Sequence, residues 1–234
     1  MLKRSEGVLI QRQTPWLAEF PKFLSQREVD LLIEIAEHTG FEKEDSLPTK
    51  VRDVWKIDCE SPRCRQHPFV NEIYRRVGAL LDMPQLNFES LEFLRYGKHQ
   101  HYVPHMDSSE GESIFEDYEI ARGGLRVLTV FFYLSDVVAG GETVFPDAKP
   151  VKLKVIPEKG KVVVWANTFS DIFRSNEAAT HGARPVEKVE HFLECTDASP
   201  SRALSRVHRC TSSLYILSSW WSRMLEGSSF LIRC

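Results

Sequence analysis

The sequence lacks the features that mark several large classes of protein. Five cysteines in 234 residues are too few and too scattered for a disulfide framework or for a zinc site made of paired Cys-x-x-Cys motifs. No apolar run reaches the roughly 18 residues that cross a membrane, and the start MLKRSEGVLIQRQTPW has too short an apolar core for a signal peptide. A formal net charge of -3 gives no electrostatic support for binding nucleic acid or an anionic membrane.

What is present is typical of one globular domain with a tail. Hydrophobic residues make up 42% of the chain and charged residues 27%, and the length suits a single core. We find no internal repeat. Cys59 and Cys64, in DCESPRC, either close a small disulfide loop in an oxidising compartment or remain free thiols beside a turn, and the sequence leaves both possibilities open.

Two amphipathic helices are predicted in the N-terminal part. In FLSQREVDLLIEIAEHTG, Ser25 and Glu28 form a capping box and Gly40 is a natural end. In HPFVNEIYRRVGALLDMP, Pro68 suits the first turn and Pro84 follows the end. Each helix has an apolar face, so we expect both to pack on a sheet; the predicted faces are Val29, Leu32, Ile33 and Ala36, and Val70, Ile73, Val77 and Leu80 or Leu81.

From residue 90 onward the pattern changes to that of short strands separated by Gly, Pro, Asp and Asn. Seven segments have it: LEFLRYG, QHYVPHMD, LRVLTVFFYLSD, GETVFP, VKLKVIP, KGKVVVWAN and THGARPVEK. They predict an α+β chain whose core is mainly β, as a sandwich, barrel or jelly roll. After Lys188 the character changes again, and we do not expect the segment from Val189 to Cys234 to continue the sheet.

A possible metal site begins in YVPHMDSSEGES. On a strand, His105 and Asp107 point to the same side, although such a pair alone is more often a surface feature. His181 in THGARPVEK offers a third ligand, although a lone histidine at a strand end more often faces solvent. Two imidazoles and one carboxylate on one face of an octahedral iron leave three positions open for a cosubstrate and oxygen.

Four longer stretches, which include most of these segments, carry a resemblance to a known family. LRYGKHQHYVPHMD, GGLRVLTVFFYLSDVVAGGETVFP, KGKVVVWAN and HGARPVEK resemble the catalytic domain of prolyl 4-hydroxylases, which are iron(II) and 2-oxoglutarate dependent dioxygenases. PKFLSQREVDLLIEIAE and LPTKVRD are similar to the N-terminal portion of that family. The resemblance implies a double-stranded β-helix, or jelly roll, over residues 21–188, with supporting N-terminal helices, an extension at 1–20 and a divergent tail at 189–234.

The resemblance also implies a reaction and its cofactors. Fe(2+) and 2-oxoglutarate are expected at the site, with L-ascorbate as reductant, and 2-oxoglutarate is converted to succinate and carbon dioxide while a peptidyl proline gains a hydroxyl group. A proline-rich peptide or protein is the implied substrate, and the endoplasmic reticulum is the compartment that the family suggests.

Residue roles follow by position. The resemblance makes His105, Asp107 and His181 the iron ligands, and Tyr102 and Thr129 contacts of the far carboxylate of 2-oxoglutarate. Arg52 and Trp55, in KVRDVWKIDC, match the region of a flexible substrate-binding loop.

The sequence departs from the family at three places. A lysine normally follows the distal histidine by ten residues and pairs with 2-oxoglutarate, whereas this chain has His191, which pairs with the carboxylate only when protonated. Asp53 and Val54 replace a usual Thr-Ser pair, and FLECTDASPSR does not match the final strand. Activity is therefore in doubt, and two alternatives stay open: a jelly-roll binding module that keeps the iron ligands, or an oxygenase of the same chemistry for another substrate. The sequence carries no signal for an oligomeric state.

Overall fold

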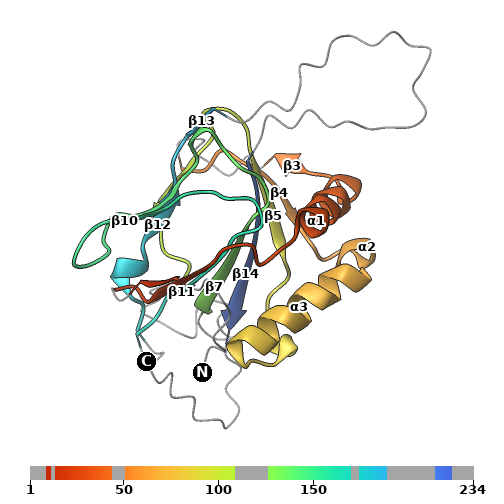
Figure 1. The fold of residues 1–234 in the computed structure, drawn as a ribbon, viewed down its shortest axis with the longest axis horizontal. Helices are drawn as coiled ribbons and strands as arrows, with labels where there is room; N and C mark the ends of the chain where they lie inside the picture. The colour runs from red at the N-terminus through yellow and green to blue at the C-terminus, as the bar shows by residue number, and fades with distance from the viewer. Residues whose placement is uncertain are drawn as a thin grey trace.

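The computed structural model describes residues 9–11, 14–43, 51–108, 126–169, 174–188 and 214–222. These residues form three layers, in which helices cover one face of a large sheet and a smaller sheet faces its other side (Figure 1). Within this part of the chain, none of the helices has the length and apolar character needed to span a membrane.

Both sheets are antiparallel. The large sheet has the order β1 (Leu9–Gln11), β2 (Leu17–Phe20), β11 (Val162–Ala166), β7 (Arg126–Tyr133), β14 (Leu214–Ser222), β5 (Glu92–Tyr96), β4 (Trp55–Asp58) and β3 (Glu42–Lys43). The small sheet has the order β10 (Leu153–Val155), β9 (Thr143–Phe145), β12 (His181–Ala183) and β6 (Tyr102–His105), and β13 (Val186–Lys188) pairs separately with β8 (Ala139–Gly140). All seven predicted strand segments form strands, and because β2 pairs with β11, the large sheet includes part of the stretch 1–20.

The two predicted helices are confirmed. α1 (Gln26–Thr39) begins at the capping box, in which the Ser25 side chain accepts from the Glu28 N–H and the Glu28 carboxylate accepts from the Ser25 N–H at 2.7 Å. α3 (Pro68–Leu81) ends at Asp82, which adopts the left-handed conformation. The buried face of α1 includes Ile35, whereas the predicted Ile33 is only half-buried. The remaining helical turns are α2 (Pro62–Arg65), η1 (Gln85–Asn87) and η2 (Glu177–Ala179).

Alternation along the strands of the large sheet creates two separate cores. On β7, Val130 and Phe132 belong to the core under the helices, whereas Phe131 and Tyr133 belong to the core between the sheets. Trp165 of β11, with no exposed surface, is the largest fully buried side chain of the inner core. The helices therefore stabilise one face of the large sheet, and its other face is left to enclose a site.

Cys59 and Cys64 form a disulfide, so the first of the two possibilities that the sequence left open is the one observed. Both residues are fully buried in the core under the helices. The bridge joins the end of β4 to α2, where Cys64 lies.

The position of β14 corrects one expectation. Residues after Lys188 were expected not to continue the sheet, yet Leu214–Ser222 lies between β5 and β7 and pairs with both. Its sequence, LYILSSWWS, shows no regular alternation of polar and apolar residues. Its position is set by backbone pairing with β5 and β7. Because these strands are far from it in the sequence, its local pattern did not predict this pairing.

The central place of β14 predicts how truncated chains behave. Removing residues 189–234 deletes the strand between β5 and β7, so we expect loss of the cooperative thermal transition followed by circular dichroism. Removing only residues 223–234 is the matched control, because it keeps every strand described here, and it should unfold cooperatively. An unchanged midpoint in the shorter chain would show that the sheet does not depend on β14.

Candidate metal centre

The pairing of two short strands brings two histidines together. In the register of β6 and β12, His105 lies directly opposite His181. Gly182 makes this approach possible, since a Cβ there would lie 2.8 Å from the Tyr102 carbonyl oxygen and 2.9 Å from the Pro104 nitrogen. The glycine next to His181 therefore has a structural reason, which is to let the two strands come close.

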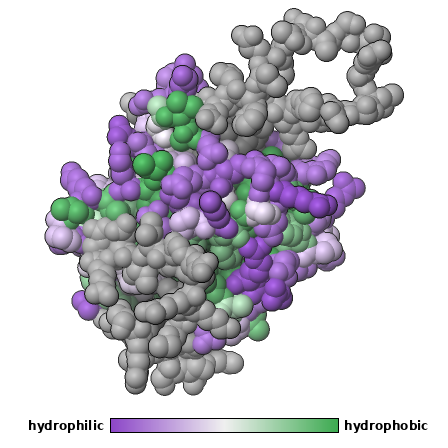
Figure 2. Space-filling view, in the orientation of Figure 1, coloured by the Kyte–Doolittle hydropathy of each residue, from purple (hydrophilic) through white to green (hydrophobic). Residues whose placement is uncertain are grey.

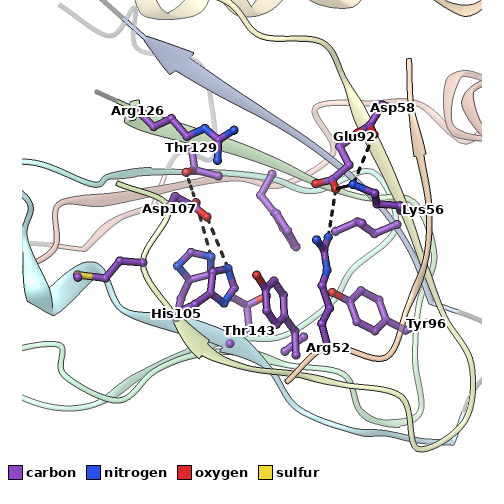
Figure 3. Close-up of a pocket in the computed structure, with 17 residues that line it drawn as sticks. Arg52, Lys56, Asp58, Glu92, Tyr96, His105, Asp107, Arg126, Thr129 and Thr143 are labelled. Carbon is purple, nitrogen blue, oxygen red and sulfur yellow. Dashed lines mark hydrogen bonds and ion pairs between the residues drawn. The ribbon is translucent and has the colours of Figure 1, made fainter. Parts of the chain in front are cut away.

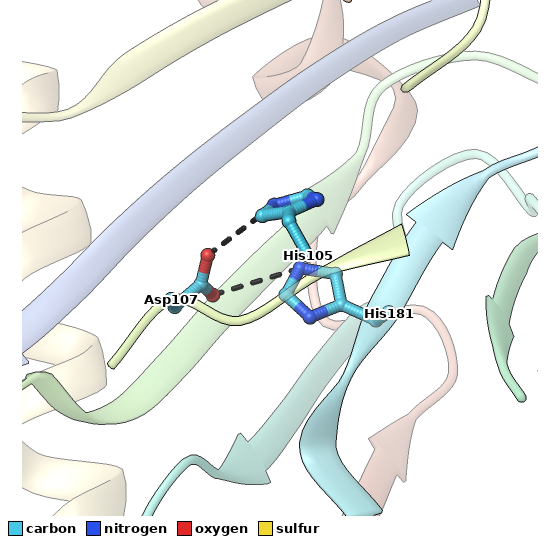
Figure 4. A group of neighbouring side chains, drawn as sticks. All are labelled: His105, Asp107 and His181. Atoms are coloured by element: carbon cyan, nitrogen blue, oxygen red, sulfur yellow. Dashed lines mark ion pairs between the residues drawn. The ribbon is translucent and has the colours of Figure 1, made fainter. Parts of the chain in front are cut away.

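Asp107 completes a group of three potential ligands (Figure 4). One donor atom from each of His105, Asp107 and His181 lies within 4.8 Å of the others. Each Asp107 oxygen is 3.6 Å from the Nε2 atom of one histidine, which is too long for a direct hydrogen bond. The three side chains thus face a common point without closing it by bonds among themselves.

The hydrogen bonds of the two histidines leave their Nε2 atoms able to bind a metal ion. His105 Nδ1 lies 3.0 Å from the Val103 carbonyl oxygen, and His181 Nδ1 lies 3.0 Å from the Ala179 carbonyl oxygen. A carbonyl oxygen only accepts, so each Nδ1 donates its hydrogen and each Nε2 presents a lone pair. Two neutral imidazoles and one carboxylate suit a divalent transition metal with open positions, such as iron(II).

Thr129 connects Asp107 to the large sheet. The Thr129 hydroxyl donates to Asp107 Oδ2 at 2.6 Å and accepts from Asn167 Nδ2 at 2.8 Å. Thr129 and Asn167 are both buried, on β7 and just after β11. The single hydroxyl hydrogen of Thr129 is directed to Asp107, so in this arrangement Thr129 orients the carboxylate, and its expected contact with 2-oxoglutarate stays a prediction.

Burial and charge act in opposite directions on the three groups. Burial disfavours ionisation of Asp107, but the positive charge of His181 and His105 when they are protonated and the Thr129 hydroxyl outweigh it and hold the pKa of the carboxyl well below its usual value. For His181, burial lowers the pKa of the imidazole despite the nearby Asp107. The arrangement therefore offers an ionised carboxylate beside a neutral His181, which is the protonation state that metal binding requires.

The three ligands lie at one end of a cavity of about 290 Å³ between the sheets (Figure 3). Its volume is near the lower end of the roughly 300–1,000 Å³ of small-molecule sites. Tyr102, which was predicted to contact 2-oxoglutarate, lines the cavity, and its ring stacks on that of His105 with centroids 3.7 Å apart. Thr143 lines it too, with its hydroxyl accepting from the Tyr133 hydroxyl at 2.7 Å.

The structure separates the two residues predicted to bind substrate. Arg52 lines the cavity, whereas Trp55 is absent from the described residues that line it. On β4, Lys56 and Asp58 face the cavity, so Trp55 points to the opposite face of the strand, where the Arg95 guanidinium lies 5.2 Å from its ring centroid. His191 falls outside the residues that the structure describes.

Sequence reasoning missed several charged residues of the cavity. Glu92 and Arg126 line it from β5 and β7, and Lys56 and Asp58 line it from β4. One signal was available for Glu92, because it shares a strand face with Leu94 and Tyr96, and an acidic residue on an otherwise apolar face is unusual. No comparable pattern marks Arg126, which stands at the first position of its strand.

Comparisons with known proteins agree with this geometry. A family model described as the 2OG-Fe(II) oxygenase superfamily matches residues 91–194, the range that contains all three potential ligands. Prolyl 4-hydroxylase 2 of Arabidopsis thaliana is 31% identical over 193 residues, which are 73% of this chain and 62% of the relative. Prolyl 4-hydroxylase subunit alpha-1 of Homo sapiens is 35% identical over 121 residues, which are 52% of this chain and 22% of that subunit. This chain thus spans less than two thirds of the length of these relatives.

Solved structures share the fold at lower identity. The viral collagen prolyl hydroxylase of Paramecium Bursaria Chlorella virus-1, in its 2OG complex, matches with a TM-score of 0.63 and 20% identity, over 89% of this chain and 96% of that one. A Pseudomonas putida prolyl-4-hydroxylase matches with a TM-score of 0.56 and 15% identity, over 90% and 94% of the two chains. The chain belongs to the 2OG-Fe(II) oxygenase superfamily and has prolyl 4-hydroxylase relatives at about 30–35% sequence identity.

Proposed function

We propose that this chain is an iron(II) and 2-oxoglutarate dependent dioxygenase that hydroxylates peptidyl proline. In the balanced reaction, one oxygen atom of O₂ enters a C–H bond of the substrate as hydroxyl, and the other enters succinate as 2-oxoglutarate loses carbon dioxide. The observation that carries the proposal is the convergence of His105, Asp107 and His181 on one point at the end of a cavity. Family membership supplies the cosubstrate.

The residues have separate tasks in this proposal. His105, Asp107 and His181 hold iron(II) from one side, and the bound iron with 2-oxoglutarate supplies the oxidising chemistry. Thr129 orients Asp107, and the carbonyl oxygens of Val103 and Ala179 keep each imidazole hydrogen on Nδ1.

The remaining lining of the cavity keeps the site dry and orients its ligand. Leu94, Phe131 and Ala183 provide apolar walls, and Tyr102 stacks on His105 beside the space that 2-oxoglutarate occupies in this proposal. The layered sheets with a site between them also support a double-stranded β-helix as the fold. L-ascorbate is proposed as the reductant that keeps the iron ferrous.

The relatives support a peptide substrate. They are named as prolyl 4-hydroxylases and a collagen prolyl hydroxylase, so a proline-rich chain is the substrate class proposed here. The described part of the face in Figure 2 mixes hydrophilic areas with apolar ones, and exposed apolar side chains such as Val51 and Phe169 are available to contact a peptide.

One observation favours a second candidate, a binding module that holds iron without turnover. The tenth residue after His181 is His191, and the sequence of β14, LYILSSWWS, contains no basic residue. A cosubstrate with two carboxylates then lacks the cation that the resemblance leads us to expect. Measuring turnover in a metal-loaded protein distinguishes the two candidates.

The first prediction concerns metal binding. The full chain should bind one iron(II) or manganese(II) ion, and Asp107→Ala or His181→Ala should lower the metal content to background because each removes one of three ligands. The measurement is metal content after desalting, with His101→Gln as the matched control, since that histidine is outside the ligand group. Equal loss in the control variant would remove the triad from the proposal.

The second prediction tests the role of Thr129. Thr129→Val removes the hydroxyl that donates to Asp107 at similar side-chain volume, so metal affinity should fall by about 10- to 100-fold. Thr129→Ser keeps a hydroxyl and should bind metal nearly as the original chain does. If the valine and serine variants bind equally well by calorimetry, the hydroxyl does not position the carboxylate.

The third prediction concerns turnover. With iron(II), 2-oxoglutarate, L-ascorbate and a proline-rich peptide, the full chain should form succinate together with a peptide heavier by one oxygen atom. The Asp107→Ala variant should give only background succinate, because it lacks the carboxylate ligand. A chain that binds metal and 2-oxoglutarate but gives no succinate with any proline-containing peptide contradicts hydroxylation of peptidyl proline and leaves the binding module or an oxygenase for another substrate.

A further inference from the structure

A buried ion pair lies in the cavity wall away from the three ligands (Figure 3). Arg52 Nη2 is 3.1 Å from Glu92 Oε1, and the side chains are only 13% and 4% exposed. Lys56 Nζ lies 3.7 Å from the same Glu92 oxygen and 3.4 Å from Asp58. Two cations and two acids thus gather at one place inside the site.

The Tyr102 ring contacts both Arg52 and the potential metal ligand His105. The Arg52 guanidinium carbon lies 4.7 Å from the Tyr102 ring centroid, and the Tyr102 ring stacks on His105 at 3.7 Å. A backbone bridge between Arg52 and Tyr102 fixes this relation. The guanidinium and the metal ligands therefore line the same cavity and are linked through contacts with the Tyr102 ring.

A diacid such as 2-oxoglutarate needs a cation in the same cavity. If 2-oxoglutarate binds iron through its keto oxygen and the adjacent carboxylate, the second carboxylate enters the cavity with a full charge and loses its water. A guanidinium has five N–H donors and binds carboxylates through paired bonds, so bonds to Glu92 and to the Tyr96 hydroxyl do not by themselves prevent it from binding a second carboxylate.

Three basic side chains line the cavity among the residues described, and they differ in how they are engaged. Arg126 makes two bonds of 2.9 Å to the two oxygens of Glu89, and its side chain is 36% exposed. Lys56 is 31% exposed and lies next to Asp58. Arg52 is the most buried of the three and the one in contact with Tyr102.

We propose that Arg52 binds the carboxylate of 2-oxoglutarate that is remote from the metal. This inference rests on the proposed function. It gives the chain a cation for its cosubstrate even though β14 has no basic residue. Burial raises the pKa of the Glu92 carboxyl, against the effect of Arg52 and Lys56.

The test compares two ligands that differ only at the remote end. 2-Oxopentanoate has the keto acid and the five-carbon chain of 2-oxoglutarate but lacks the second carboxylate. Dissociation constants of both are measured by calorimetry on the full chain loaded with manganese(II) without oxygen, so no turnover is needed. The original chain should prefer 2-oxoglutarate, and Arg52→Met should weaken 2-oxoglutarate binding by about 10- to 100-fold while changing 2-oxopentanoate binding by less than about threefold.

Two further variants separate binding from structural support. Glu92→Gln removes the competing acid and leaves the guanidinium, so 2-oxoglutarate should bind as tightly as before or more tightly. Arg126→Met removes another cavity arginine and should keep the preference for 2-oxoglutarate within about threefold. If Arg52→Met alone fails to fold, the double variant Arg52→Met with Glu92→Gln removes both charges of the pair and should show the same loss of preference.

Each other outcome overturns the inference in a distinct way. Equal weakening by Arg52→Met and Glu92→Gln would make the pair structural only, and loss of preference in Arg126→Met instead would assign the contact to that residue. If every variant still prefers 2-oxoglutarate, the proposed function stands but the role of Arg52 is wrong. If neither the original chain nor any variant binds 2-oxoglutarate, the proposed function is wrong as well.

Discussion

The pairing of β6 with β12 is the constraint on which the site depends. It sets His105 opposite His181, and Asp107, two residues after His105, has one carboxylate oxygen 3.6 Å from the Nε2 atom of each ring. These strands belong to the small sheet, whereas Thr129, the donor to Asp107, belongs to the large one. The ligand group is therefore correctly arranged only when the two sheets are packed together. The inner core around Trp165 and Phe145 provides that packing, and Trp165 lies against His181 with ring centroids 4.8 Å apart.

Local patterns predicted much of the fold. The capping box and apolar face gave the bounds of α1 to within a residue or two, and alternation found all seven strand segments between residues 90 and 188. Short or irregular strands were missed, notably β2 and β14, because their places come from hydrogen bonding to β11, or to β5 and β7, and not from their own sequence. Such pairing is a property of the assembled sheet, which no window of residues contains.

The candidate site was predictable in its ligands but not in its surroundings. His105 and Asp107 were found because they were expected to share the face of one strand, although β6 ends at His105 and Asp107 follows it, whereas His181 was recognised through the resemblance. The Arg52 and Glu92 pair joins residues 40 positions apart, and neither shows by itself that it has a partner. Likewise, nothing near Thr129 in the sequence indicates that its hydroxyl serves Asp107, since that contact depends on how the two sheets face each other.

The location of β14 has a consequence for the order in which the protein is made. During translation, β5 and β7 leave the ribosome well before Leu214–Ser222, the strand that later separates them. Until that strand is synthesised, each of them presents an unpaired backbone edge, a form prone to pairing with other chains. The residues before β14 therefore expose two strand edges until Leu214–Ser222 has been added between them.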